Sequence, residues 1–172
     1  PIREAIRMLE LEGLAVTMPR KGAEVAKMTE KDMEDVLQIR KALDELAVGL
    51  ACDNMTEEEL KQLQVALKNF EESTRSGDVK QIAQADVEFH DAIYQAADNP
   101  KLVNMLNNLR EQMYRYRVEY LKNESIYPRL IEEHQGIYDG LKRKNKEAVV
   151  EIVSHHVENQ EIVVKNIIQE QE

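Results

Sequence analysis

From Thr29 almost to its end, the chain repeats hydrophobic positions at steps of three and four residues. This spacing places them on one face of an α-helix, whereas a strand would show strict alternation. Short breaks divide the pattern into six helical segments, which predicts an all-α, antiparallel bundle. Residues of the types that cap helices stand at the start of four segments: Thr29, Thr56, Asp78 and Asn99.

The first of these predicted helices carries a long apolar seam. It consists of Val36, Ile39, Leu43, Leu46 and Leu50, at alternating steps of three and four residues. Such a seam is typical of a helix that packs lengthwise on another helix. We therefore expect it to be covered, either within the bundle or, in a two-fold dimer, at the interface between two copies.

The N-terminal residues show a different pattern. Pro1–Glu12 reads as a helix that ends at Gly13, a residue suited to the left-handed conformation of a C-cap. Leu14–Met18 and Ala23–Val25 then read as two short strands, and Pro19–Gly22 forms a basic turn between them. This predicts a helix followed by a hairpin, and we expect the front of this small domain to be missing from the chain.

Polar side chains interrupt the apolar faces of three predicted helices. Asp86 and His90 stand four residues apart on the inward face of the third helix. His134 takes an inward position on the fifth helix, and His156 does so on the last. His155 lies about 100° further round that helix and is expected to face solvent or a neighbouring helix.

Burying a carboxylate and several imidazoles is costly, by roughly 1–3 kcal/mol for each group left without a partner. A single inward histidine is most often a core residue hydrogen-bonded to a neighbour. Four ligand-type residues on three inward faces favour a bound divalent cation instead. Three imidazoles and one carboxylate suit zinc, nickel, cobalt, manganese or iron, and leave coordination positions open to a small bidentate anion.

Charge is spread unevenly along the chain. Its 172 residues carry a formal net charge of −10, yet residues 1–27 hold five basic and four acidic groups. The strongly acidic remainder repels a phosphate backbone, so any contact with nucleic acid belongs to the N-terminal stretch. No apolar run approaches the length of a membrane span, so we expect no membrane contact. The single cysteine, Cys52, excludes an intramolecular disulfide and favours a cytoplasmic location.

The N-terminal residues also resemble a known DNA-binding motif. Pro1–Glu10, Glu12–Leu14 and Pro19–Val25 are similar to the recognition helix and wing of the GntR family of bacterial winged helix-turn-helix repressors. The resemblance implies that residues 1–27 are the C-terminal part of such a domain, which alone would bind operator DNA poorly. It also implies the residues that contact DNA: Arg3 and Arg7 on the helix, and Arg20, Lys21 and Gly22 in the wing.

Residues 28–172 resemble the FCD effector domain of the FadR subfamily. The motifs that carry the likeness are Ile39–Asp44, Asp86 with His90, Asn99–Pro100, Glu133–His134 and His156–Asn159. The resemblance implies a bundle of FCD type with six to seven helices, which binds an effector and forms a homodimer. It also implies a divalent metal held by the positions that match the family's ligands: Asp86, His90, His134 and His156.

Two arginines are candidates for binding an organic anion beside the metal. Arg40 lies one helical step from the apolar seam, and Arg117 belongs to a stretch in which arginines and tyrosines alternate. A guanidinium can hold a carboxylate through two hydrogen bonds. We therefore predict a ligand-responsive bacterial transcriptional regulator, a repressor by its resemblance, with a metal-dependent site for a small organic acid. The alternative is a helical metalloenzyme that activates water or oxygen, although no general base is evident beside the ligands.

Overall fold

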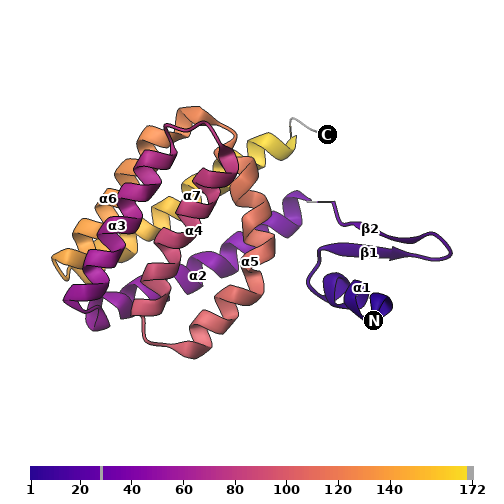
Figure 1. Ribbon diagram of the computed structural model, residues 1–172, viewed down its shortest axis with the longest axis horizontal. Helices are drawn as coiled ribbons and strands as arrows, with labels where there is room; N and C mark the ends of the chain where they lie inside the picture. The colour runs from indigo at the N-terminus through magenta and orange to yellow at the C-terminus, as the bar shows by residue number, and fades with distance from the viewer. Residues whose placement is uncertain (28, 170–172) are drawn as a thin grey trace.

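A computed structural model describes residues 1–27 and 29–169 of the chain. The described residues form a helical bundle that is preceded by a helix and a hairpin (Figure 1). The bundle contains α2 (Glu30–Asn54), α3 (Glu57–Ser73), α4 (Val79–Ala96), α5 (Pro100–Leu121), α6 (Tyr127–Lys142) and α7 (Lys146–Gln169), with a short 3-10 turn, η1 (Glu124–Ile126), before α6. The predicted all-α bundle is confirmed. None of the described helices is both long enough and apolar enough to cross a membrane.

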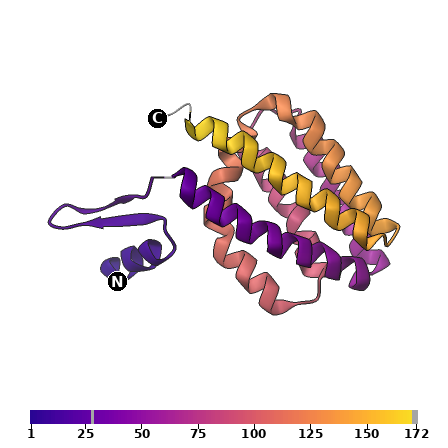
Figure 2. The same ribbon diagram turned by 180° about the vertical axis from the view of Figure 1, so that it is seen from behind.

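The N-terminal segment lies beside the bundle rather than within it (Figures 1 and 2). It consists of α1 (Ile2–Leu11) and an antiparallel hairpin of β1 (Ala15–Met18) and β2 (Gly22–Val25). The hairpin turn is tight, and Arg20 and Gly22 in it adopt positive φ angles of 65° and 93°. Every residue of α1 is at least partly exposed in the described chain.

The helices of the bundle begin where the sequence places capping residues. Each of the four predicted caps accepts a hydrogen bond from a backbone N–H of the first turn, as expected of N-cap side chains: Thr29, Thr56, Asp78 and Asn99. At Thr56 the bond is reciprocal, because Glu59 in turn accepts from the Thr56 backbone N–H at 2.8 Å. The breaks between helices are therefore set locally, by the residues at the helix ends.

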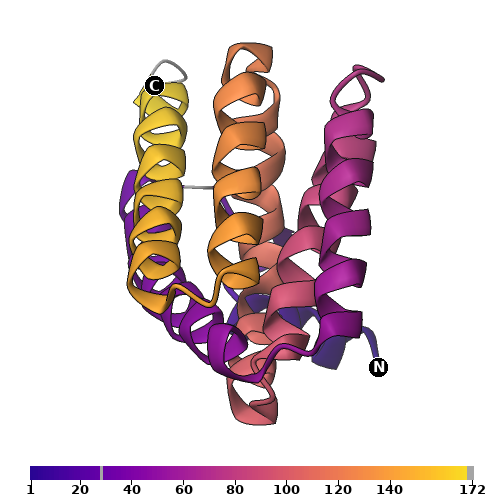
Figure 3. The same ribbon diagram turned by 90° about the vertical axis from the view of Figure 1, so that its left-hand side faces the viewer.

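The helices pack side by side along their length. α2 and α7 run next to each other across one face of the bundle (Figure 2). The view in Figure 3 shows α6 beside α7 and α3 beside α4. The apolar core falls into two main clusters, one containing Phe70 and Ile82 and the other containing Phe89 and Ile137. The polar residues described below lie where these two clusters meet.

The predicted apolar seam of α2 is covered only in part within the described bundle, and its coverage by a second copy stays a prediction. Ile39 and Leu46 are each 49% exposed. The buried face is rotated from the seam and includes two charged residues. The buried residues of α2 are Met33, Val36, Leu37, Arg40, Asp44, Ala47, Val48, Gly49, Ala51 and Cys52. The spacing of hydrophobic residues alone does not show that the charged residues Arg40 and Asp44 belong to this face.

Gly140 on α6 marks a close approach between two helices. A Cβ atom at this position would lie 2.8 Å from Val149 Cβ on α7. We therefore expect Gly140→Ala to force α6 and α7 apart and to lower the free energy of unfolding by about 1–3 kcal/mol. Gly136→Ala is the matched control, because its Cβ would meet only the Ile152 side chain, at 3.5 Å. Urea unfolding followed by circular dichroism compares them, and equal losses would contradict the close packing.

Candidate metal centre

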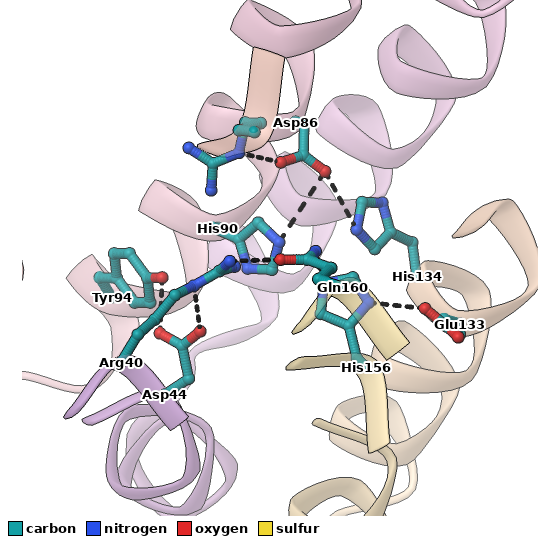
Figure 4. A network of polar contacts seen from close by, with 10 residues as sticks. Arg40, Asp44, Asp86, His90, Tyr94, Glu133, His134, His156 and Gln160 are labelled. Atoms are coloured by element: carbon teal, nitrogen blue, oxygen red, sulfur yellow. Dashed lines mark hydrogen bonds and ion pairs between the residues drawn. The ribbon is translucent and has the colours of Figure 1, made fainter. Parts of the chain in front are cut away.

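Four polar side chains from three helices meet inside the bundle (Figure 4). Asp86 and His90 project from adjacent turns of α4, His134 comes from α6, and His156 comes from α7. At 0–4% exposure, all four are buried. His155 is exposed, as predicted. The structure therefore brings together the four residues that the sequence singled out as ligands.

The distances within this group suit a shared ion. The ligand nitrogens that His90, His134 and His156 offer all lie within 4.8 Å of one another. Asp86 Oδ1 lies 3.3 Å from His134 Nε2 and 3.9 Å from His90 Nε2. The three imidazoles could hold an ion placed among them, and Asp86 approaches two of them, those of His134 and His90.

Aromatic rings hold His134 in place. The Phe89 ring stacks on its imidazole with a centroid distance of 4.2 Å and an angle of 17° between the planes. Phe70 packs against it at 4.5 Å in a tilted geometry. The two phenylalanines come from the two apolar clusters of the core, so the centre is enclosed by apolar side chains and shielded from bulk water.

The protonation states of the group follow from its burial. Burial lowers the pKa of His90 well below its ordinary value and lowers that of His134 to about 3, because an imidazolium would lose its hydration. Burial by itself would raise the pKa of Asp86, but the Arg117 guanidinium and the nearby imidazoles outweigh it and lower that pKa. Neutral His90 and His134 beside an ionised carboxylate are in the states that a metal requires of its ligands.

Several buried polar atoms of the centre lack hydrogen-bond partners among the described residues, and this bears on whether a metal fits. Buried polar atoms normally have a hydrogen-bond partner, so a cluster without one needs an explanation. The buried side-chain atoms that find no hydrogen-bond partner among the described residues include both Asp86 oxygens, His90 Nε2 and both His134 nitrogens. Each is an atom type that ligates a divalent cation. The residues present therefore fit a metal site.

Arg117 on α5 is the direct neighbour of Asp86. Its Nε forms an ion pair with Asp86 Oδ2, without the alignment of a good hydrogen bond, and its side chain is 6% exposed. The sequence suggested Arg117 as a residue for an organic anion, whereas here it neutralises one of the predicted ligands. The stretch of alternating arginines and tyrosines gave no sign of this pairing, because it depends on how α5 is placed against α4.

A second buried network adjoins the four ligands. Arg40 Nε donates to Asp44 Oδ2 at 3.0 Å, and the Tyr94 hydroxyl donates to Asp44 Oδ1 at 2.6 Å. Gln160 connects Arg40 to His156 through its side-chain amide (Figure 4). Arg40 Nη2 is buried and has no hydrogen-bond partner among the described residues. Sequence reasoning missed Asp44, Tyr94 and Gln160, although the four-residue spacing of Arg40 and Asp44 was a signal for the first.

Glu133 orients His156. Its Oε2 accepts a hydrogen bond from His156 Nδ1 at 2.8 Å, and its Oε1 accepts one from Asn159 Nδ2 at 2.7 Å. A carboxylate can only accept, so Nδ1 of this imidazole carries a proton. The Gln160 amide nitrogen beside Nε2 can only donate, so Nε2 carries the lone pair. Outer carboxylates that fix a histidine tautomer in this way are common at metal sites.

A small cavity opens beside the ligands, between α4 and α5. It measures about 20 Å³ and is lined in part by His90, Tyr94 and Arg117. This is room for about one water molecule. Arg110 and Asp91 lie at its rim and form two hydrogen bonds, of 3.0 and 2.9 Å.

The residues predicted to contact DNA lie elsewhere. All of them are exposed on the N-terminal segment: Arg3, Arg7, Arg20, Lys21 and Gly22. Two residues of α5 connect this segment to the bundle. The Gln112 side chain donates to the Glu12 carbonyl, and Arg115 Nη2 donates to the Ala26 carbonyl at 2.7 Å.

Known transcriptional regulators share the fold of this chain. The chain is similar to E. coli McbR/YncC, whose structure it matches with a TM-score of 0.85 at 24% identity, over 97% of this chain and 80% of that one. In sequence it is 32% identical to the HTH-type transcriptional regulator McbR of Escherichia coli strain K12 over 152 residues, which cover 86% of this chain and 67% of that protein.

Two further relatives and a family model agree with this class. The chain is 30% identical to the uncharacterized HTH-type transcriptional regulator YdhC of Bacillus subtilis strain 168, over 99% of this chain and 76% of that protein. It is 27% identical to a probable D-xylose utilization operon transcriptional repressor of Paenarthrobacter nicotinovorans, over 91% of this chain and 69% of that protein. The FCD domain model matches residues 35–159. The chain belongs to the FCD family, within the GntR-type transcriptional regulators, and it is a regulator and not an enzyme.

The ion pair between Arg117 and Asp86 can be tested by removing the arginine. Arg117→Met leaves a buried carboxylate without its countercharge, so we expect the metal-free protein to lose about 3–5 kcal/mol of unfolding free energy. Arg110→Met is the matched control on the same helix, because its pair with Asp91 is 33–40% exposed and should be worth about 1 kcal/mol or less. Urea unfolding in the presence of a chelator measures both, and losses of similar size would contradict the assignment.

Proposed function

We propose that this regulator is a repressor whose helical domain binds a divalent metal ion and, beside it, a small organic acid. The observation that carries the proposal is the cluster of buried ligand atoms on Asp86, His90 and His134 that lack hydrogen-bond partners among the described residues, next to the lone pair of His156. An apolar core would be the more stable filling for this space, so the polar centre calls for a functional reason.

Each residue of the centre has a part in this proposal. Asp86, His90, His134 and His156 would hold the ion, which supplies positive charge and open coordination positions to carboxylate oxygens. Arg40 would bind a carboxylate of the acid, because its Nη2 is buried and lacks a hydrogen-bond partner among the described residues. We retain Arg117 as a second contact, available to an anion when Asp86 turns to the metal. The metal is zinc, nickel, manganese or a similar divalent ion.

Metal binding is tested by removing one ligand. His134→Ala should abolish the uptake of a stoichiometric divalent metal, because His134 is fully buried at the centre of the group. Elemental analysis of the purified protein measures this, and a thermal-shift screen of small carboxylates should show that the effector response is lost with the metal. His155→Ala is the control, since this exposed neighbour of His156 should leave metal content unchanged. Unchanged metal content in His134→Ala would contradict the site.

The route by which the acid affects DNA binding is proposed to run through α5. An acid needs more room than the cavity of about 20 Å³ between α4 and α5 provides, so its binding has to move these helices. α5 carries Arg117, which faces the centre, and Arg115, which holds the Ala26 carbonyl beside the hairpin. A shift between states from 1:99 to 99:1 requires a preference of about 5.5 kcal/mol for one state. Metal coordination combined with a guanidinium contact can supply this, and a single surface ion pair cannot.

We also propose that the regulator acts as a homodimer. Ile39 and Leu46 leave an apolar strip exposed on α2, which a second copy of the chain would cover. Two DNA-binding segments related by a two-fold axis match the symmetry of a palindromic operator. In this arrangement residues 1–27 belong to the DNA-binding domain, and residues 28–172 form the domain that binds effector and dimerises.

The proposed DNA contacts predict a salt-dependent effect. The double variant Arg20→Ala, Lys21→Ala should weaken binding to duplex DNA in low-salt buffer similarly for all sequences, because the hairpin tip would contact phosphates. It should also reduce the slope of log affinity against log salt by about two. Lys61→Ala, Lys68→Ala on α3 is the control of equal charge change. Fluorescence anisotropy measures both, and the same loss in the control would contradict a role for the hairpin.

A further inference from the structure

The side-chain amide of Gln160 bridges two of the residues discussed above. Gln160 lies on α7 one turn after His156 and is 6% exposed. Its Nε2 lies 2.9 Å from His156 Nε2, and its Oε1 accepts a hydrogen bond from Arg40 Nη1 (Figure 4). An amide nitrogen is not a usual metal ligand. The Gln160 amide nitrogen nevertheless lies next to His156 Nε2, the atom with which this histidine would bind a metal.

The chemistry of its neighbours fixes the direction of this amide. A guanidinium only donates, so it selects the amide oxygen, and Gln160 Nε2 must then face His156. Glu133 fixes the proton of His156 on Nδ1, so His156 Nε2 is an acceptor. The amide N–H therefore donates to the same lone pair with which His156 would bind a metal ion. A lone pair cannot serve both partners at once.

We infer that Gln160 competes with the metal for His156 Nε2 and thereby sets the metal affinity of the centre. The inference rests on the proposed metal site. In the metal-free protein the amide satisfies the buried imidazole nitrogen, and in the loaded protein it has to turn away from it. The hydrogen bond lost in this exchange reduces the net free energy of metal binding. Gln160 is thus an affinity-determining residue and not itself a ligand.

Replacing the amide with an apolar side chain of similar length tests the competition. Gln160→Met should bind zinc about threefold to tenfold more tightly than the unaltered protein, which corresponds to the loss of one hydrogen bond. Competition titration with a chromophoric zinc chelator measures the affinity. Gln169→Met is the matched control, because this exposed glutamine on the same helix forms its hydrogen bonds among the described residues with Glu30 and should leave zinc affinity unchanged.

A double-mutant cycle separates competition from a general effect on packing. In a His156→Ala background, titrated with zinc at concentrations high enough to load the weakened three-ligand site, the gain from Gln160→Met should disappear, because the amide then has no lone pair to occupy. A gain that persists in this background would overturn the inference, as would equal zinc affinities for Gln160→Met and the unaltered protein. Failure of the unaltered protein to bind zinc would overturn the proposed metal site together with this inference, so the two failures are distinguishable.

A measurement on the unaltered protein does not depend on how the variants fold. Zinc should shift the side-chain amide resonances of Gln160 in a ¹H–¹⁵N correlation spectrum, because the hydrogen bond to His156 is broken. The side-chain resonances of Gln169 should stay in place. Zinc binding that leaves the Gln160 amide unchanged would overturn the inference.

Discussion

The structure depends on how one buried carboxylate is compensated. Asp86 lies 1% exposed among three imidazoles, with a single guanidinium, that of Arg117, as its ion-pair partner in the described chain. A charge placed so deeply is strongly destabilising unless it is paired, and even a paired charge is often less stable than an apolar filling. The convergence of α4, α5, α6 and α7 on this point therefore has a cost in stability. A function that needs the carboxylate explains why the cost is retained.

The geometry of α5 connects this carboxylate with the N-terminal segment. Arg115 and Arg117 are two residues apart, and on an α-helix such residues point about 200° apart. Arg117 consequently turns inward to Asp86, while Arg115 turns outward to the Ala26 carbonyl. A rotation or shift of α5 would therefore act on both contacts. The proposed coupling between the two sites would use this helix, which has a buried contact on one side and a contact to the hairpin segment on the other.

Much of the fold and part of the centre could be predicted from the sequence, for identifiable reasons. Caps such as Thr56 and Asp78 are local signals, so the helix starts were correct. The inward positions of Asp86 and His134 followed from periodicity within single helices, which needs no knowledge of neighbours. What single-helix periodicity cannot supply is the register between helices, and this is what pairs Arg117 with Asp86.

The same limit explains the errors. Arg40 was singled out for its charge, but its burial and its bond to Gln160, 120 positions later in the chain, depend on how α2 packs against α7. The buried face of α2 includes Arg40 and Asp44, which neutralise each other inside the bundle, and the spacing of hydrophobic residues alone does not place them there. A pattern of hydrophobic positions does not reveal polar residues that neutralise one another in pairs inside the core.

The polar centre is asymmetric, and the asymmetry bears on how it would accept a ligand. On one side, His156 is held by Glu133 and Gln160. On the other side, His90 and His134 keep nitrogens that lack hydrogen-bond partners among the described residues. An ion that binds His90 and His134 would break no hydrogen bond, so this contact costs little free energy. An ion that binds His156 would have to replace the hydrogen bond from Gln160. The fixed tautomer of His156 prepares its lone pair for this exchange, and the competing amide limits how favourable the exchange is.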